Sequence, residues 1–336
     1  MSQPTAGTAT TSTVTVATGG GMTITVTSDG AITVTPPPVT PPSGTSTTVF
    51  FDDFTGTELN SAYWNAINTT TGPQNPEAFG SGDQEQYLAS MVALDGDSNL
   101  VFTVGPEGTL GAQPGYWPSG RVDSFHAPGQ FYDGVFATHG SAPKVAVLPG
   151  QSCEFSVKIT PLAGLWTAFW FESPGAVGGA YPTDYYEYDG VEAGNYDGNP
   201  ALTGSTAWGP GATAQQNLTA RVNAAARTLF NLGDGKYHTC RIDYGGTAVS
   251  TYIDGVLQYS ITQAQVNAAY GPQAGLNAQF GGQEWPYSQP EGLAIVMNCA
   301  VNQSVTGTTP AAASLPHEVM AVDWVRVYSP AGPYVA

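Results

Sequence analysis

The sequence predicts an all-β protein built as a two-sheet sandwich, and the first observation behind this is its composition. Only 10% of the 336 residues are charged, while 41% are hydrophobic and 11% are aromatic. Turn-forming residues are abundant, with 42 Gly and 26 Pro. Few charges together with many turn-formers and aromatics favour many short strands over charged amphipathic helices. At this length we expect one large sheet-based domain with an appendage.

The second observation is a series of strand-like segments, which recur from Val49 onward between Gly, Pro and Asp turns. The clearest are Leu100–Val104, Cys153–Ile159, Thr239–Tyr244, Val249–Ile253, Leu293–Met297 and Ala321–Tyr328. Helical periodicity is weak: residues 263–269 fit one short helix, and residues 217–230 fit a helix or a strand. So many strands over residues 49–330 predict two packed sheets, followed by a short tail over 331–336.

The third observation is a different composition in the first 48 residues, which contain no Lys, Arg or aromatic residue and only one acid, Asp29. Three segments within residues 1–35 alternate apolar and polar residues, and the breaks between them suit hairpin turns. These segments are Thr13–Val16, Thr23–Thr27 and Ala31–Thr35. The pattern predicts a three-stranded meander, and the Pro-rich residues 36–48 predict a stiff, extended spacer.

So small a sheet cannot bury its Val and Ile face alone, so we expect it to pack against a partner or copies of itself. Residues 1–48 would then be an attachment segment that joins the chain into a homo-oligomer or a larger assembly. The alternative interpretation of the same composition is a flexible Thr-rich linker.

The charge balance limits the partners. Eight Lys and Arg residues against 26 Asp and Glu give a net charge of −18. Binding a phosphate backbone requires cations that this chain lacks, so no nucleic-acid partner is expected. An acidic, aromatic-rich surface suits neutral polar ligands such as sugars. No apolar run is long enough to span a membrane, and the start at Met1 lacks the features of a signal peptide.

The three cysteines are odd in number, and each lies in a strand-like run. Cys153, Cys240 and Cys299 are therefore expected to be small buried hydrophobes, with one disulfide as the alternative. No CxxC or CxxH spacing occurs, so metal binding by them is not expected.

The segment that contains Glu187, Asp189 and Glu192 is the one that suggests chemistry. On a strand Glu187 and Asp189 share a face, and one bulged residue, for which Gly190 is well suited, brings Glu192 to that face too. The outer acids are then roughly 13 Å apart along the backbone, and two Glu side chains can close this to the ~5–5.5 Å of a retaining glycosidase pair. Mutual repulsion raises the pKa of one acid, as a general acid requires. The spacing also fits a solvated acidic strand or a calcium loop.

An ordered series of short motifs surrounds these acids. It comprises Phe51–Phe54 with Trp64, Glu85–Tyr87, Ser119–Ser124, Gly164–Trp170, Tyr237–Thr239, Tyr252–Val256, Pro290–Leu293, Met297–Val301 and Val322–Tyr328. Over residues 49–330 the series resembles glycoside hydrolase family 16. It is similar in particular to the branch with a bulged Glu-x-Asp-x-x-Glu motif, found in β-1,3-glucanases (laminarinases), agarases and carrageenases. The resemblance implies a concanavalin-like β-jelly roll.

The resemblance also implies roles for the acids, with Glu187 as the nucleophile, Glu192 as the acid/base and Asp189 orienting the nucleophile. The implied reaction is retaining cleavage of a β-linked polysaccharide by double displacement. Tyr186, Tyr188 and Gly190 depart from the family pattern around the acids, and so does the loop Ser173–Asp184, so the pocket floor is expected to differ.

Further implied residues are aromatic, basic or acidic. Trp166 and Trp170 would stack on sugar faces, and Arg121 would bind sugar hydroxyls. Three other tryptophans in predicted Gly- and Pro-rich loops would line the cleft: Trp117, Trp208 and Trp285. His238 is expected to be structural. No cofactor is required, and a structural calcium would involve Asp53 and Asp323, which occupy the positions matching those of calcium-binding relatives.

Two other classes of function stay open at this stage. One is a virion structural protein of a phage, in the tail or on the surface, whose glycosidase-like domain binds or trims host envelope glycan. The N-terminal meander and the absence of a signal peptide fit this hypothesis, which would place the chain in a virion or outside the cell by a non-Sec route. The other is a catalytically dead, lectin-like sugar-binding module.

Overall fold

The structure is a computed structural model that describes most of the predicted domain and three short stretches before it. The described residues are 12–14, 23–26, 32–35, 46–68, 84–125, 130–132, 135–138, 143–172, 187–196, 199–208, 217–221, 232–245, 248–262 and 292–329. The chain divides into two compact units, Met1–Ser43 and Gly44–Ala336. Each unit is described here by itself. Residues 36–45, the loop 173–186 and the tail 330–336 lie outside the described ranges.

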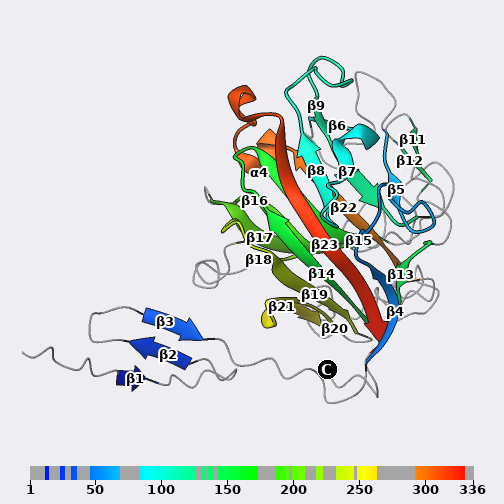
Figure 1. The fold of residues 1–336 in the computed structure, drawn as a ribbon. Helices are drawn as coiled ribbons and strands as arrows, with labels where there is room; N and C mark the ends of the chain where they lie inside the picture. Colours follow the sequence, from blue (N-terminus) through cyan, green and yellow to red (C-terminus); the bar gives the residue numbers. More distant parts are fainter. Residues whose placement is uncertain are drawn as a thin grey trace, which may run out of the picture. The chain divides into compact units, whose positions relative to one another are not determined.

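The first unit contains the predicted meander. Strands β1 (Ser12–Val14), β2 (Thr23–Val26) and β3 (Ile32–Thr35) form one antiparallel sheet in that order (Figure 1). In the register, Val14 pairs with Ile24, and Ile24 pairs with Val34. The alternation of Thr with Val or Ile therefore produces the three strands that it predicted.

The second unit is a sandwich of two eight-stranded sheets, as predicted, and we name them sheet I and sheet II. Sheet I consists of β5 (Asn65–Ala66), β10 (Arg121–Asp123), β13 (Ala146–Val147), β15 (Leu165–Glu172), β16 (Glu187–Tyr196), β17 (Asn199–Trp208), β18 (Asn217–Arg221) and β22 (Leu293–Val301). Its order is β18-β17-β16-β15-β22-β10-β5, with β13 also paired to β22.

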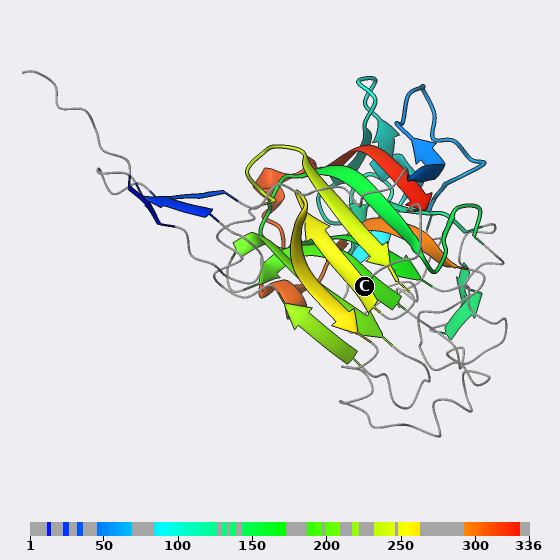
Figure 2. The same cartoon turned by 90° about the horizontal axis from the view of Figure 1, so that it is seen from below.

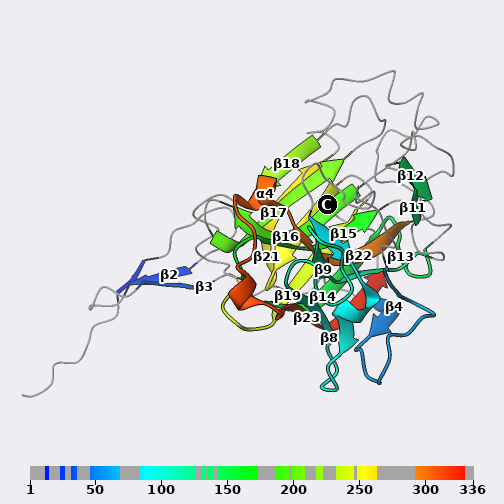
Figure 3. The same ribbon diagram turned by 90° about the horizontal axis from the view of Figure 1, so that it is seen from above.

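Sheet II is antiparallel throughout as well. It consists of β4 (Thr47–Asp52), β7 (Val92–Leu94), β8 (Leu100–Val104), β14 (Gln151–Ile159), β19 (His238–Tyr244), β20 (Ala248–Ile253), β21 (Val256–Thr262) and β23 (His317–Ser329). Its order is β21-β20-β19-β14-β23-β8-β7, with β4 also paired to β23. The curved strands of both sheets can be followed in Figures 2 and 3.

Smaller elements complete the unit. Two short strand pairs are β6 (Glu85–Tyr87) with β9 (Trp117–Ser119), which is parallel, and β11 (Gln130–Tyr132) with β12 (Val135–Thr138). Three one-turn helices occur where the structure describes the chain, namely η1 (Ala89–Met91), α4 (Gln303–Thr306) and η2 (Ala312–Ser314). No helix among the described residues is long and apolar enough to cross a membrane.

All six strands that the sequence predicted most clearly are present. The ambiguous segment 217–230 begins with strand β18, and the expected helix at 263–269 lies outside the described residues. The first strand of the sandwich, β4, begins at Thr47, slightly earlier than predicted. β20 alternates half-buried and buried residues because one of its faces meets the core, whereas β22 is buried at every position, as expected for a strand covered on both faces.

The main core lies between the two sheets. Phe155 of β14 stacks on Phe169 of β15 with ring centroids 3.4 Å apart, which joins sheet II to sheet I. A second cluster forms on the opposite face of sheet I from Phe125, Ala168, Trp170, Ala294 and Val296. The three cysteines are buried and free, as predicted, and burial raises the pKa of the Cys299 thiol to about 12.

Candidate active site

The register of β15 and β16 determines where the three acids lie. Ala168 pairs with Glu192, Trp170 with Asp189, and Glu172 with Glu187. The register shifts between Phe169 and Trp170, because Gly190 is an extra residue opposite them. Residues two apart on β15 share a face, so the bulge brings the backbone positions of all three acids to one face of sheet I, as predicted.

The bulge is supported from sheet II. A Cβ atom on Gly190 would collide with the side chain of Ile242, so no larger residue fits there without displacing the core. The hydroxyl of Thr251 donates to the Gly190 carbonyl at 3.2 Å, and the Tyr188 hydroxyl lies 3.2 Å from the same Thr251 oxygen. Both side chains are buried. The opposing sheet therefore fixes the irregularity that aligns the acids.

The same face continues across three more strands, and we call it the acid face. Asn298 and Val296 of β22 lie in register with Ala168 and Trp170, and Arg121 and Asp123 of β10 follow beside them. Asn65 of β5 pairs with Asp123 at the far edge. The acid face thus presents polar and charged residues on a sheet whose other face is apolar.

Burial distinguishes this face from a solvated acidic strand. Asp189 is 4% exposed and Glu192 is 5% exposed, so both carboxyl groups lie away from bulk water. The backbone of Glu187 opens β16, and its side chain lies outside the described residues. Removal from water strengthens every charge–charge interaction among such groups.

Arg121 is buried within the acid face. Its guanidinium lies over the Trp170 ring at 5.5 Å and over the Tyr87 ring at 5.9 Å, and its Nη2 is 3.8 Å from Oε2 of Glu172. Trp170 donates from Nε1 to Oδ1 of Asn298 at 2.7 Å, which fixes the ring. Arg121 and Trp170 therefore belong to one packed unit, and contact of either with sugar stays a prediction.

Asp123 is a buried acid at the other side of Arg121. Its Oδ1 accepts from Nδ2 of Asn65 at 2.9 Å and from the backbone N–H of Phe125 at 3.3 Å. Nζ of Lys144 donates in turn to Oδ1 of Asn65 at 2.6 Å. Burial raises the pKa of Asp123 to about 6, and the nearby Arg121 partly opposes that rise.

The predicted tryptophans have different locations. Trp166 and Trp170 lie on β15. They are an even number of residues apart, so both point to the acid face. The prediction that Trp117 and Trp208 lie in loops was wrong, because the first is in β9 and belongs to the main core and the second ends β17. Trp117 is held there by the parallel pairing of β9 with β6, a long-range contact. Trp285 lies outside the described residues.

The described residues contain no group of three His, Cys, Asp or Glu side chains that could hold a metal ion. Oδ1 of Asp53 accepts instead from the hydroxyl and the backbone N–H of Thr55, at 2.8 and 3.2 Å. These hydrogen bonds lower the pKa of Asp53. Calcium binding at Asp53 and Asp323 stays an expectation.

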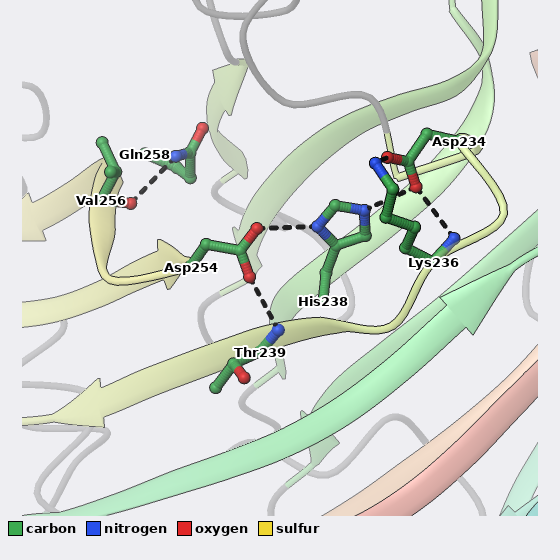
Figure 4. A network of polar contacts seen from close by, with 7 residues as sticks. All are labelled: Asp234, Lys236, His238, Thr239, Asp254, Val256 and Gln258. Atoms are coloured by element: carbon green, nitrogen blue, oxygen red, sulfur yellow. Dashed lines mark hydrogen bonds and ion pairs between the residues drawn. The ribbon is translucent and has the colours of Figure 1, made fainter. Parts of the chain in front are cut away.

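Sheet II has a separate polar cluster around His238 (Figure 4). Nδ1 of His238 lies 2.7 Å from Oδ2 of Asp254, and Nε2 lies 3.1 Å from Oδ1 of Asp234. The other oxygen of Asp254 accepts from the backbone N–H of Thr239 at 2.9 Å. The cluster ties the turn before β19 to the turn after β20, which agrees with the structural role predicted for His238.

Two acids of the acid face had no role in the sequence-based prediction, namely Glu172 and Asp123. Glu172 is fully buried and pairs with Glu187 across the strands. A usable signal existed for it, because Glu172 lies two residues after Trp170 and must share its face on a strand.

Comparisons with known proteins address the fold. No protein-family model and no curated protein matches the chain. The endo-β-1,3-glucanase from Pyrococcus furiosus has the same fold with a TM-score of 0.60 and 21% identity, over 87% of this chain and 97% of its own. A glycoside hydrolase family 16 endo-glucanase from Bacteroides ovatus gives a TM-score of 0.56 and 22% identity, over 83% and 99%.

A third solved structure is a pseudo β-1,3-glucanase of Mycobacterium tuberculosis, which is also an immunostimulatory antigen. Its TM-score is 0.55 at 22% identity, over 84% of this chain and 98% of its own. The chain therefore has the jelly-roll fold of glycoside hydrolase family 16 endo-glucanases. At these identities the likeness establishes the fold, and the chemistry depends on the side chains of the acid face.

Proposed function

We propose that the chain is a retaining endo-glycosidase that cleaves a β-linked polysaccharide, with a β-1,3-glucan as the first substrate to test. The observation that supports this most directly is the bulged register of β15 and β16, which aligns the backbone positions of Glu187, Asp189 and Glu192 on one face, where Asp189 and Glu192 are buried. Its occurrence in a fold shared with endo-β-1,3-glucanases adds to the case.

The reaction that we propose has two balanced steps. A carboxylate oxygen of Glu187 forms a bond to the anomeric carbon while the glycosidic C–O bond breaks, and Glu192 gives its proton to the departing sugar oxygen. Glu192, now a carboxylate, takes a proton from water as that water attacks the anomeric carbon. The ester bond to Glu187 breaks as the water oxygen bonds to that carbon, which releases a glycan with a new reducing end and restores both acids.

Asp189 lies between the two acids on the same face and would orient Glu187. Trp166 and Trp170 are candidate platforms for sugar rings, and Arg121 is a candidate partner for hydroxyl groups. No cofactor is needed for this chemistry.

The test is the release of reducing ends from laminarin, agarose and mycobacterial arabinogalactan by the full chain. We expect release from one of these, and a loss of about 10³-fold or more in Glu187→Gln and Glu192→Gln. Glu318→Gln, an exposed acid on sheet II, is the matched control and should keep full activity. A folded chain that releases nothing from any glycan would contradict the proposal.

A second proposal concerns the context of this activity. The first unit forms its own small sheet, separate from the sandwich in its internal contacts. We infer from this that residues 1–48 attach the chain to copies of itself or to a larger particle, such as a phage tail or virion surface. The sandwich would then bind or trim host envelope glycan, and it would be lectin-like if hydrolysis is absent, as the name of the pseudo β-1,3-glucanase suggests for that protein. Light scattering of the full chain tests self-association, because a monomer would contradict it.

A further inference from the structure

Glu172 is an acid next to the proposed nucleophile for which neither the motif nor the comparisons provide a role. It ends β15 and is the register partner of Glu187 on β16. Residues directly opposite each other on antiparallel strands have Cβ atoms about 4.5–5.5 Å apart. Its side chain is 0% exposed, so it is not a solvated surface charge.

Arg121 provides the counter-charge. Its Nη2 lies 3.8 Å from Oε2 of Glu172, and its side chain is 3% exposed. The guanidinium also lies over the rings of Trp170 and Tyr87. A buried charge is costly unless it is paired, so each member of this pair holds the other in place.

The other groups around Glu172 are mostly acids. Asp189 pairs with Trp170, two residues from Glu172 on β15, Asp123 lies on the same face on β10, and Ala294, the partner of Glu172 on β22, is uncharged. Glu192 lies farther along β16, opposite Ala168. The nearest acid on β6, Glu85, accepts from the backbone N–H of Val301 and so serves the end of β22. Arg121 is therefore a cation on an acidic face, and it forms an ion pair there with Glu172.

We propose that Glu172 is a positioning residue for the proposed glycosidase reaction, which holds Arg121 on Trp170 and neutralises its charge beside Glu187. The inference rests on the proposed function. Without Glu172, the uncompensated guanidinium would favour the ionised form of every acid on this face. With Glu172, the acid/base can remain protonated while the nucleophile is ionised.

Asp123 is a reporter of this charge that does not require any enzymatic activity. Burial raises its pKa to about 6, Arg121 lowers it, and the charge of Glu172 contributes to raising it. The carboxyl carbon of Asp123, observed by NMR in the full chain labelled with ¹³C at aspartate carboxyls, therefore reports the balance between Arg121 and Glu172. Asp123→Asn assigns the signal.

In Glu172→Gln we expect the midpoint of the Asp123 titration to fall by about one pH unit, and in Arg121→Gln we expect it to rise. The acidic limb of the pH–rate profile for glycan hydrolysis should move in the same directions. Glu172→Asp keeps the charge and should restore both midpoints. A merely structural role would lower activity or stability without moving either one.

If Glu172→Gln fails to fold, the double variant Arg121→Gln/Glu172→Gln replaces the buried pair by neutral groups. Its Asp123 midpoint should lie below that of Arg121→Gln, because it lacks the negative charge that Glu172 contributes. Equal midpoints in those two proteins, or in the parent and Glu172→Gln, would overturn the inference. Hydrolysis that is absent in the parent contradicts the proposed function instead, and the titration still decides whether Glu172 acts on this face.

Discussion

The described part of the sandwich contains two carboxylate clusters, and their physical surroundings are opposite. On the acid face of sheet I, burial raises the pKa of Asp123 to about 6. In the sheet II cluster, burial alone would raise the pKa of Asp254, but hydrogen bonds from His238 and from the backbone N–H of Thr239 outweigh it and leave that pKa lowered. Asp234, bonded to Lys236 and His238, also has a lowered pKa.

This difference shows what separates a candidate site from a structural cluster of the same residue types. At sheet II each carboxylate meets a donor near the surface, so the ionised form is favoured and the cluster fixes two turns. On the acid face the side chains of Asp123, Glu172, Asp189 and Glu192 are at most 5% exposed, and Arg121 forms an ion pair with Glu172. Such burial is costly for folding, and at Asp123 it raises the pKa and so favours the protonated carboxyl.

The largest effect that we expect comes from Gly190→Val, which tests whether the bulge creates the acid face. Added methyl groups would meet the Ile242 side chain in the core, so the free energy of unfolding should fall by about 3 kcal/mol. Ala93→Val adds the same kind of side chain at an exposed position of β7 and is the control. Urea unfolding measures both variants, and equal stability would show that the bulge tolerates a side chain.

The next effect tests the acid face through pH. Because the pKa of Asp123 rises from 3.8 when unfolded to about 6 when folded, the free energy of unfolding falls as the pH rises between those values. Asp123→Asn removes this ionisable group, so it should stabilise the chain by about 2 kcal/mol at pH 7.5 and by much less at pH 4.

Urea midpoints of the parent and of Asp123→Asn across this pH range provide the measurement. Asp97→Asn, an exposed aspartate in the turn before β8, is the matched control and should show no such trend. A difference between parent and Asp123→Asn that does not change with pH would mean that burial leaves this carboxyl unperturbed.

Much of this arrangement could be predicted from the sequence, because it depends on local rules. Period-two alternation predicted the strands, and the spacing of Glu187, Gly190 and Glu192 predicted both the bulge and the shared face. These inferences need only the geometry of one strand.

What the sequence could not provide depends on register between distant segments. The contact of Arg121 with Glu172 requires β10, β22 and β15 to lie side by side in one particular alignment. Trp117 likewise enters the core only because β9 pairs with β6. Composition around Trp117 suggests a loop, and long-range pairing overrides that local preference.

The smallest effect that we expect concerns the cluster around His238 on sheet II. Hydrogen bonding to Asp254 and to Asp234 raises the pKa of His238 above 6.5. Its contribution to the free energy of unfolding is therefore fully present below about pH 6.5 while the carboxylates are ionised, and is lost as the pH rises through the raised folded-state value. His238→Gln should destabilise the chain by about 0.5–1 kcal/mol at pH 6, since Asp254 is 44% exposed and solvent screens the pair.

At pH 9 the free energies of unfolding of the parent and of His238→Gln should differ by less, because His238 is then neutral in the parent. His317→Gln, at the start of β23, changes a histidine outside the cluster and is the control for loss of an imidazole. The trend with pH has the same sign as that of Asp123→Asn, because folding raises the pKa of both groups and each variant gains stability relative to the parent as the pH rises. A His238→Gln difference that grows toward pH 9 would mean that neutral imidazole, rather than its charge, stabilises these two turns.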